Sequence, residues 1–193
     1  MNRAAWDERV PFCYTEKAQQ IVKPNKGASP IQDLLVTQLE HVPGNYSGGE
    51  KLKFVEASLQ QGLTVLPRDT FDLVFISISS LCYVAKIKEW ARIVSGLLKL
   101  GRRLFVREFH PVLLSLDDGK PDEMVINLPY FKREEPVIMD KQGTYINLGD
   151  YIFTSTRCAV FNHGIGEVVQ ALLHEGMRLT GLREHESALL TGA

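Results

Sequence analysis

Two side chains suited to acid–base chemistry stand close together in the segment Glu108-Phe109-His110-Pro111. Glu108 and His110 are two positions apart, so the alternation of a strand places both on one face. A histidine there could act as a general base toward a hydroxyl, an amine or a thiol. A histidine before proline is also common as a hydrogen-bonded strand end, and the sequence leaves both interpretations open.

A second candidate, His163, stands in the turn Asn162-His163-Gly164. Asparagine is favoured at the position before a helix, so Asn162 is predicted to cap a helix over Gly166 to Glu175. His163 then either belongs to the capping turn or contacts a substrate. No pair of histidines has the spacing of metal ligands together with a third ligand, so no metal site is predicted.

The elements that must position these side chains form one strand–helix–strand unit. Phe71 to Ile76 is short, apolar and β-branched, as in a parallel strand buried on both faces. Apolar residues recur at helical spacing from Val84 to Lys99, Gly101 stands where a helix would stop, and Leu104 to Val106 resumes the strand pattern. A right-handed crossover brings the C-terminal ends of both strands to one edge, where open α/β sheets bind ligands.

The rest of the chain is less regular. Residues 1–50 are punctuated by prolines, and residues 116–150 are rich in turn-forming residues with interspersed aromatics. The alternation over Tyr151 to Phe161 predicts a strand, and Met177 to Leu182 predicts a final strand after the last helix. We therefore expect one α/β domain that spans residues 1–193.

Three segments resemble class I S-adenosylmethionine-dependent methyltransferases, specifically small-molecule enzymes with an EFHP-type ending. The longest is similar to the fourth strand, the following helix and the fifth strand of that family: FDLVFISISSLCYVAKIKEWARIVSGLLKLGRRLFVREFHPVLL. WDERVPF, from Trp6, resembles the N-terminal lead, and FNHGIGEVVQALLHEGMRLTGLREHE, from Phe161, resembles the last helix and strand. The resemblance implies a Rossmann-like methyltransferase fold and methyl transfer from S-adenosylmethionine to a small molecule, as in secondary metabolism.

The family's glycine-rich turn and the acidic residue after its second strand are not recognisable here. Too few residues separate Pro11 from Phe54 for two βα units, so a truncated sheet is expected. Phe71 to Ile76 should then lie near or at an edge. This edge is expected to be covered by residues 29–50, paired with Leu52 to Glu56 or buried in a homodimer, and the last two are favoured. KLKFVEASL resembles the third strand, with serine where the family has aspartate. If S-adenosylmethionine binds, the predicted contacts are Ala57, Ser58, Leu59 and Ser77.

The resemblance also implies an acceptor pocket under residues 116–150, which would fold as a β-hairpin or a lid. His110 is the predicted catalytic base. The predicted substrate contacts are Trp6, Tyr83, Glu108, Tyr130 and His163. For Trp6 and Tyr130, packing is the alternative to pocket contact. The alternative function is a non-catalytic binding or partner protein with a degenerate methyltransferase fold.

Composition restricts the remaining classes. The 193 residues carry a formal net charge of -1, which predicts neither a nucleic-acid nor an anionic-membrane partner. No apolar run approaches the ~20 residues of a membrane span, and the polar N-terminus lacks a signal-peptide core, so a cytoplasmic protein is expected. Cys13, Cys82 and Cys158 are odd in number and unclustered, which predicts core thiols rather than disulfides or a zinc site.

Overall fold

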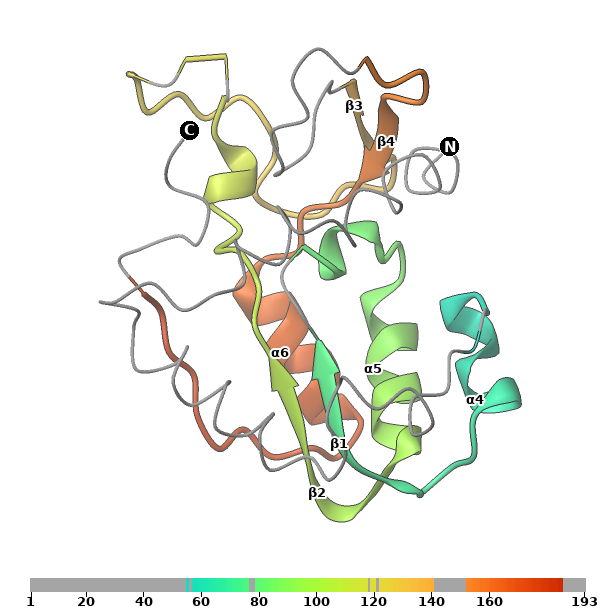
Figure 1. Cartoon of the computed structure of the whole chain (residues 1–193). Helices are drawn as coiled ribbons and strands as arrows, with labels where there is room; N and C mark the ends of the chain where they lie inside the picture. The colour runs from blue at the N-terminus through green and yellow to red at the C-terminus, as the bar shows by residue number, and fades with distance from the viewer. Residues whose placement is uncertain are drawn as a thin grey trace, which may run out of the picture. The chain divides into compact units, whose positions relative to one another are not determined.

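The computed structural model describes residues 55, 57–76, 79–117, 119–120, 122–140 and 152–185. The chain divides into two compact units, Met1–Glu56 with Gln142–Thr156, and Ala57–Lys141 with Arg157–Ala193. The single domain expected from the sequence stays a prediction. The described helices and strands all belong to the second unit (Figure 1): η1 Leu59–Gln61, α4 Gly62–Val65, β1 Phe71–Ile76, η2 Leu81–Tyr83, α5 Ile87–Leu97, β2 Leu98–Val106, η3 Leu113–Ser115, β3 Val137–Asp140, β4 Arg157–Val160 and α6 Ile165–His174.

The predicted strand–helix–strand unit is confirmed, but the predicted burial of β1 on both faces is wrong, because Leu73 is 41% and Phe75 39% exposed. β1 covers the expected residues, α5 follows it, and β2 pairs with β1 in parallel. The register places Phe75 opposite Phe105, and Ile76 opposite Val106. Both strands therefore end at the same edge, and the segments that follow them start side by side.

The start of β2 differs from the prediction. α5 ends at Leu97, and Leu98 is already extended, with φ -78° and ψ 137°. The backbone N–H of Thr70 donates to the Leu97 carbonyl at 3.1 Å and holds the chain at this point. Gly101 is therefore not a helix stop. It lies inside β2 with φ 74°, where the register to β1 is irregular, and glycine permits this bulged backbone.

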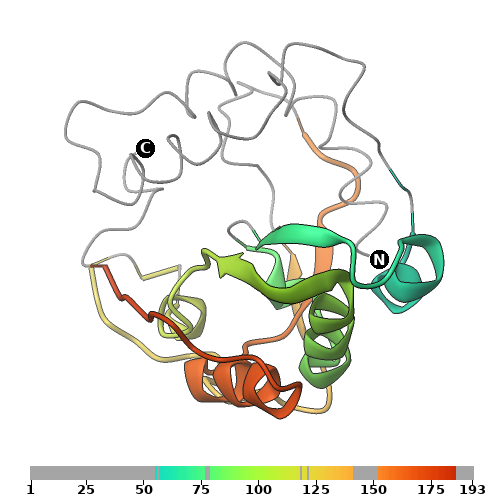
Figure 2. The same ribbon diagram turned by 90° about the horizontal axis from the view of Figure 1, so that it is seen from below.

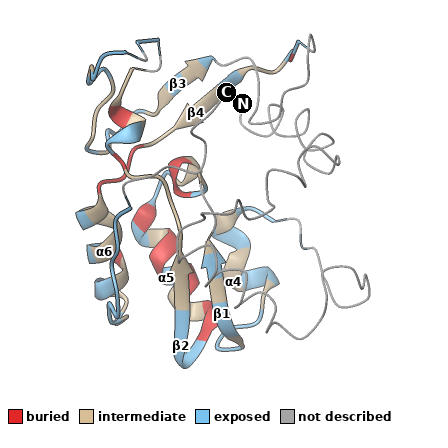
Figure 3. Ribbon diagram, turned by 60° about the vertical axis from the view of Figure 1, so that its left-hand side comes forward, coloured by how far each residue is buried: buried red, intermediate tan, exposed pale blue. Residues whose placement is uncertain are grey.

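The core lies between one face of the β1–β2 sheet and two helices. α5 and α6 both lie on this face (Figure 2), and the buried residues concentrate along α5 (Figure 3). The buried cluster consists of Leu81, Ile87, Trp90, Ala91, Val94, Leu98 and Ala171. Trp90 is 2% exposed. The helical spacing of apolar residues in the sequence thus reports a genuine inner face of α5.

A second, antiparallel pair joins β3 to β4, with Met139 opposite Cys158. The strand predicted over Tyr151 to Phe161 is confined to β4, and residues 152–156 before it are not in a strand. The insertion at residues 116–150 contributes β3, whose partner β4 lies outside it, so a hairpin within the insertion stays a prediction. Its action as a lid over an acceptor stays a prediction.

The predicted final strand over Met177 to Leu182 is wrong. α6 ends at a left-handed Gly176, with φ 76°, and residues 177–185 form no strand. The backbone N–H of Met177 donates to the Leu172 carbonyl at 3.2 Å, and the Met177 side chain packs against the core. Met177 and Leu179 instead line a cavity of about 90 Å³ beside α6 and Leu104, while Leu182 is exposed.

Among the described residues, β1 has one strand neighbour, β2, as expected for a strand near an edge. The predicted pairing with Leu52 to Glu56 falls outside the described residues, apart from Val55, which is not in a strand. No helix in the described part of the chain combines the length and the apolar character that a membrane span requires.

Candidate functional site

The loop after β1 is fastened to the end of β2 by a single carboxylate. The Glu108 oxygens accept the backbone N–H groups of Ser79 at 2.5 Å, Ser80 at 2.6 Å and Leu81 at 2.8 Å. Ser79 holds a left-handed conformation, with φ 61°, which is uncommon outside glycine. The Glu108 carboxylate therefore stabilises the backbone conformation of Ser79, Ser80 and Leu81. Substrate contact by Glu108 stays a prediction, and both of its oxygens have partners within the protein.

Two opposing effects act on the Glu108 carboxyl. Burial raises its pKa, while the backbone N–H donors favour the charged form and lower it. Burial is the larger effect, so the pKa lies above the usual value for glutamate. The proton on Glu108 is therefore coupled to the conformation of the loop after β1.

His110 lies just beyond the same strand and is engaged through both ring nitrogens. Nδ1 accepts the backbone N–H of Val112 at 3.2 Å, so the ring proton is on Nε2, which donates to Glu184 Oε1 at 2.6 Å. β2 ends at Val106, so neither Glu108 nor His110 is a residue of the strand. No hydrogen bond joins the two side chains. The role of His110 as a base stays a prediction, and it requires the ring to release Val112.

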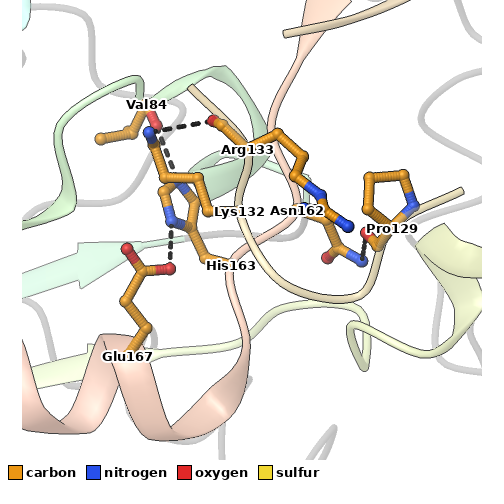
Figure 4. A network of polar contacts seen from close by, with 7 residues as sticks. All are labelled: Val84, Pro129, Lys132, Arg133, Asn162, His163 and Glu167. Carbon is orange, nitrogen blue, oxygen red and sulfur yellow. Dashed lines mark hydrogen bonds and ion pairs between the residues drawn. The ribbon is translucent and has the colours of Figure 1, made fainter. Parts of the chain in front are cut away.

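Asn162 is not the helix cap that the sequence predicts. Gly164 occupies the N-cap position of α6, without a side-chain cap bond. The Asn162 amide nitrogen instead lies 2.9 Å from the Pro111 carbonyl and 3.0 Å from Ser115 Oγ. It also lies 3.2 Å from the Pro129 carbonyl, the contact that Figure 4 shows. Its two hydrogens are shared among three acceptors. Asn162 thereby ties the segment after β2, η3 and the insertion to the turn before α6.

The reverse orientation of the Asn162 amide would place its oxygen against three oxygen atoms, so the partners fix the assignment. Asn162 Oδ1 is buried and has no hydrogen-bond partner among the described residues. A buried acceptor without a donor costs free energy. The three donor contacts of the nitrogen offset that cost.

His163 connects the first turn of α6 to the end of η2. Its Nε2 lies 2.7 Å from the Val84 carbonyl, and its Nδ1 lies 2.9 Å from Glu167 Oε2 (Figure 4). The side chain is 2% exposed. Both nitrogens therefore face oxygen atoms within the protein. Substrate contact by His163 stays a prediction, because neither nitrogen points to an open space.

Tyr130 packs against the same turn. A Cβ atom added at Gly164 would lie 3.0 Å from Tyr130 Cε1, so glycine permits this close approach. The Tyr130 ring meets the exposed Phe131 ring edge-on, with centroids 5.0 Å apart. The packing interpretation of Tyr130 is therefore realised, while pocket contact stays a prediction.

The residues predicted to contact S-adenosylmethionine do not converge. Ala57 and Ser58 are exposed, and Ser58 Oγ hydrogen bonds to Gln61 Oε1 at 3.1 Å within its own turn. Leu59 packs against the core cluster. Ser77 lies outside the described residues, as does the predicted substrate contact Trp6. Tyr83 is half-buried in η2. The described part of this set does not form a cradle that fits the cofactor.

Cys82 lies beside the Glu108 loop as a protonated thiol. Burial raises its pKa to about 12, and the charge of Glu108 acts in the same direction. Its Sγ lies 3.3 Å from the Ser79 carbonyl. Cys82 is buried and Cys158 half-buried, and both are free, as expected from the sequence, while Cys13 lies outside the described residues. No group of three or more His, Cys, Asp or Glu side chains in the described part of the chain could hold a metal ion.

Sequence reasoning missed Arg107, the residue between Val106 and Glu108. Its backbone N–H donates to the Ile76 carbonyl at 3.0 Å, and its half-buried side chain has no ion-pair partner among the described residues. Burial lowers the pKa of its guanidinium. A basic residue directly after an apolar strand was the available signal, because it places a cation at the ligand-binding edge.

No protein-family model matches the chain, and no curated protein matches it either. Among solved structures, the chain is similar to a protein from Listeria monocytogenes assigned as an S-adenosylmethionine-dependent methyltransferase, with a TM-score of 0.51 and 13% identity. That match covers 81% of this chain and 67% of the other. An S-adenosylmethionine-dependent methyltransferase from Mesorhizobium loti gives a TM-score of 0.45 and 19% identity over 74% of this chain and 57% of its own.

The first of these similarities shows the fold. The chain has the α/β, Rossmann-like fold of class I methyltransferases, and the parallel sheet of its described residues is reduced to two strands. The site therefore lies where such folds place their ligands, at the C-terminal edge of β1 and β2.

Proposed function

We propose that this protein is a methyltransferase-like protein that acts on a small molecule at the C-terminal edge of β1 and β2. One observation carries the proposal: on a methyltransferase fold, Glu108 and Asn162 draw three segments together at that edge. These are the loop after β1, the segment after β2 and the turn before α6. The sequence resemblance in the same three segments supports the same conclusion.

S-adenosylmethionine is the donor that the fold suggests, and methyl transfer asks the protein mainly to align two reactants. The described residues do not supply a fitting donor site, because Ser58 is bonded within its own turn and Leu59 packs on the core. Weak donor binding is therefore expected.

Calorimetric titration of the full chain with S-adenosylmethionine and S-adenosylhomocysteine tests this proposal, with adenosine as the control ligand. Each missing charged contact costs ~1.5 to 3 kcal/mol, so dissociation constants on the order of millimolar are expected. Transfer of a labelled methyl group to small molecules in an extract would support the enzyme. A micromolar constant would contradict the weak donor site, and binding without transfer would reject catalysis.

A second candidate function is non-catalytic binding of a small molecule or partner. This candidate is favoured because the side chains at this edge that are suited to acid–base chemistry already form hydrogen bonds within the protein. Glu108 is bonded to three backbone N–H groups, and His110 and His163 are each engaged through both ring nitrogens. This candidate would be favoured if the protein binds neither S-adenosylmethionine nor S-adenosylhomocysteine but does bind another small molecule.

A further inference from the structure

The face of the β1–β2 sheet that is turned away from α5 carries aromatic side chains. The residues packed against the core from the α5 side are Val74, Ile76, Leu104 and Val106. Alternation along each strand then places Phe75 and Phe105 on the opposite face. Their rings stack there, with centroids 5.8 Å apart and planes at 19°. Phe75 is 39% exposed, so the ring pair presents an apolar surface.

Arg107 continues the same alternation one position past β2. The bond from its N–H to the Ile76 carbonyl extends the parallel pairing beyond Val106. Its side chain therefore lies on the face of Phe105, at the C-terminal edge of the sheet. Glu108, the next residue, lies toward the opposite face, where its carboxylate is bonded to the loop after β1.

The charge of Arg107 is not balanced in the described part of the chain. No carboxylate there pairs with it, in contrast to Arg102, whose Nε lies 2.9 Å from Asp72 Oδ1. Burial lowers the pKa of the Arg107 guanidinium. A partly desolvated cation without a counter-ion costs free energy, which an anionic ligand would recover.

We propose that Arg107 binds the carboxylate of a small aromatic acid whose ring lies along Phe75 and Phe105. The planar guanidinium matches a carboxylate in a bidentate arrangement, and one positive charge balances one negative charge. A stacked ring pair on the same face of the sheet suits an aromatic body better than a sugar or a polar chain. The inference rests on the proposed small-molecule function and names the chemical class of the ligand.

The test is titration of the full chain with 3-phenylpropionate, followed by NMR or calorimetry, with 3-phenylpropionamide as the uncharged probe. Arg107→Gln is the test variant. Arg103→Gln is its matched control, because Arg103 lies on the same strand and face and is exposed. Loss of a charged hydrogen bond should weaken 3-phenylpropionate binding roughly 10- to 100-fold in Arg107→Gln. The wild type should bind 3-phenylpropionamide about as weakly as Arg107→Gln binds 3-phenylpropionate. Arg103→Gln should stay within about twofold of the wild type.

Three outcomes would overturn the proposal. These are no saturable binding of 3-phenylpropionate to the wild type, unchanged binding to Arg107→Gln, and equal weakening by both arginine variants, which would indicate general charge attraction. Thermal unfolding of every variant shows whether Arg107→Gln folds, and Arg107→Lys is the second variant if it does not. Arg107→Lys should bind 3-phenylpropionate with an affinity between those of the wild type and Arg107→Gln. If the wild type binds S-adenosylmethionine but not 3-phenylpropionate, this site alone is rejected. If the wild type binds 3-phenylpropionate but not S-adenosylmethionine, the transferase function alone is rejected.

Discussion

The Glu108 carboxylate accepts the backbone N–H of Leu81 at 2.8 Å, across 27 positions of the chain. This contact fixes the loop after β1 relative to the segment after β2, and the N–H groups of Ser79 and Ser80 reinforce it. The edge of the sheet is thus organised by one buried acid. Its ionisation should influence both stability and the shape of the candidate site.

The pH dependence of stability should reveal the raised pKa of Glu108. A folded-state pKa above the unfolded value contributes stability that is fully present below the unfolded pKa and is lost as pH rises through the folded pKa. The unfolding free energy of the wild type minus that of Glu108→Gln should therefore fall from about pH 4 upward. Urea unfolding of both proteins in the same buffers measures this difference in unfolding free energy. The contributions of the other titratable groups are the same in both proteins and cancel in the difference. A difference that increases with pH would show that the backbone N–H donors outweigh burial.

Removing Trp90 should damage the core between α5 and the sheet. Trp90 is 2% exposed and belongs to the buried cluster, so Trp90→Ala should cost about 3 to 5 kcal/mol of unfolding free energy. Arg92→Ala, on the exposed side of the same helix, should change it by about 0.5 kcal/mol or less. Urea unfolding followed by circular dichroism measures both. An unchanged midpoint for Trp90→Ala would mean that α5 is not packed on the sheet.

Cys82 should resist alkylation in the native protein. Its thiol is 8% exposed and its pKa is raised to about 12, so the reactive thiolate is scarce at pH 8. In a Cys13→Ser/Cys158→Ser protein, iodoacetamide at pH 8 should leave Cys82 unmodified until urea unfolds the chain, as mass spectrometry would show. Rapid modification of the native protein would contradict the buried position next to Glu108.

Asn162 should act as a structural tie rather than a helix cap. Asn162→Ala leaves the buried Pro111 carbonyl and Ser115 hydroxyl without this donor, so it should cost ~1 to 3 kcal/mol of unfolding free energy. Asn162→Asp should cost more, because it places a carboxylate against three oxygen atoms. Asn127→Ala, which removes an exposed amide bonded to Asp117, is the matched control and should have little effect. Equal unfolding free energies for all three variants would show that Asn162 does not stabilise the segments at this edge of the sheet.

The sequence determined the local elements of this protein. Apolar runs and helical spacing predicted β1, α5 and α6, because each pattern depends on which side of one element is buried. The crossover rule then predicted that β1 and β2 end at one edge, close to Glu108 and His110. The resemblance to methyltransferases added the fold, which the structural similarity supports.

Tertiary structure decided which partner each polar group has. Asn162 has the local signature of a cap, but its donors bind carbonyls 33 and 51 positions away. Gly101 has the signature of a helix stop, but the pairing of β2 with β1 turns it into a bulge. The absence of a strand over residues 177–182, and the lack of a carboxylate partner for Arg107 among the described residues, likewise depend on segments that are distant in the chain. Sequence patterns record the burial of a residue, whereas its hydrogen-bond and charge partners are set only when distant segments meet.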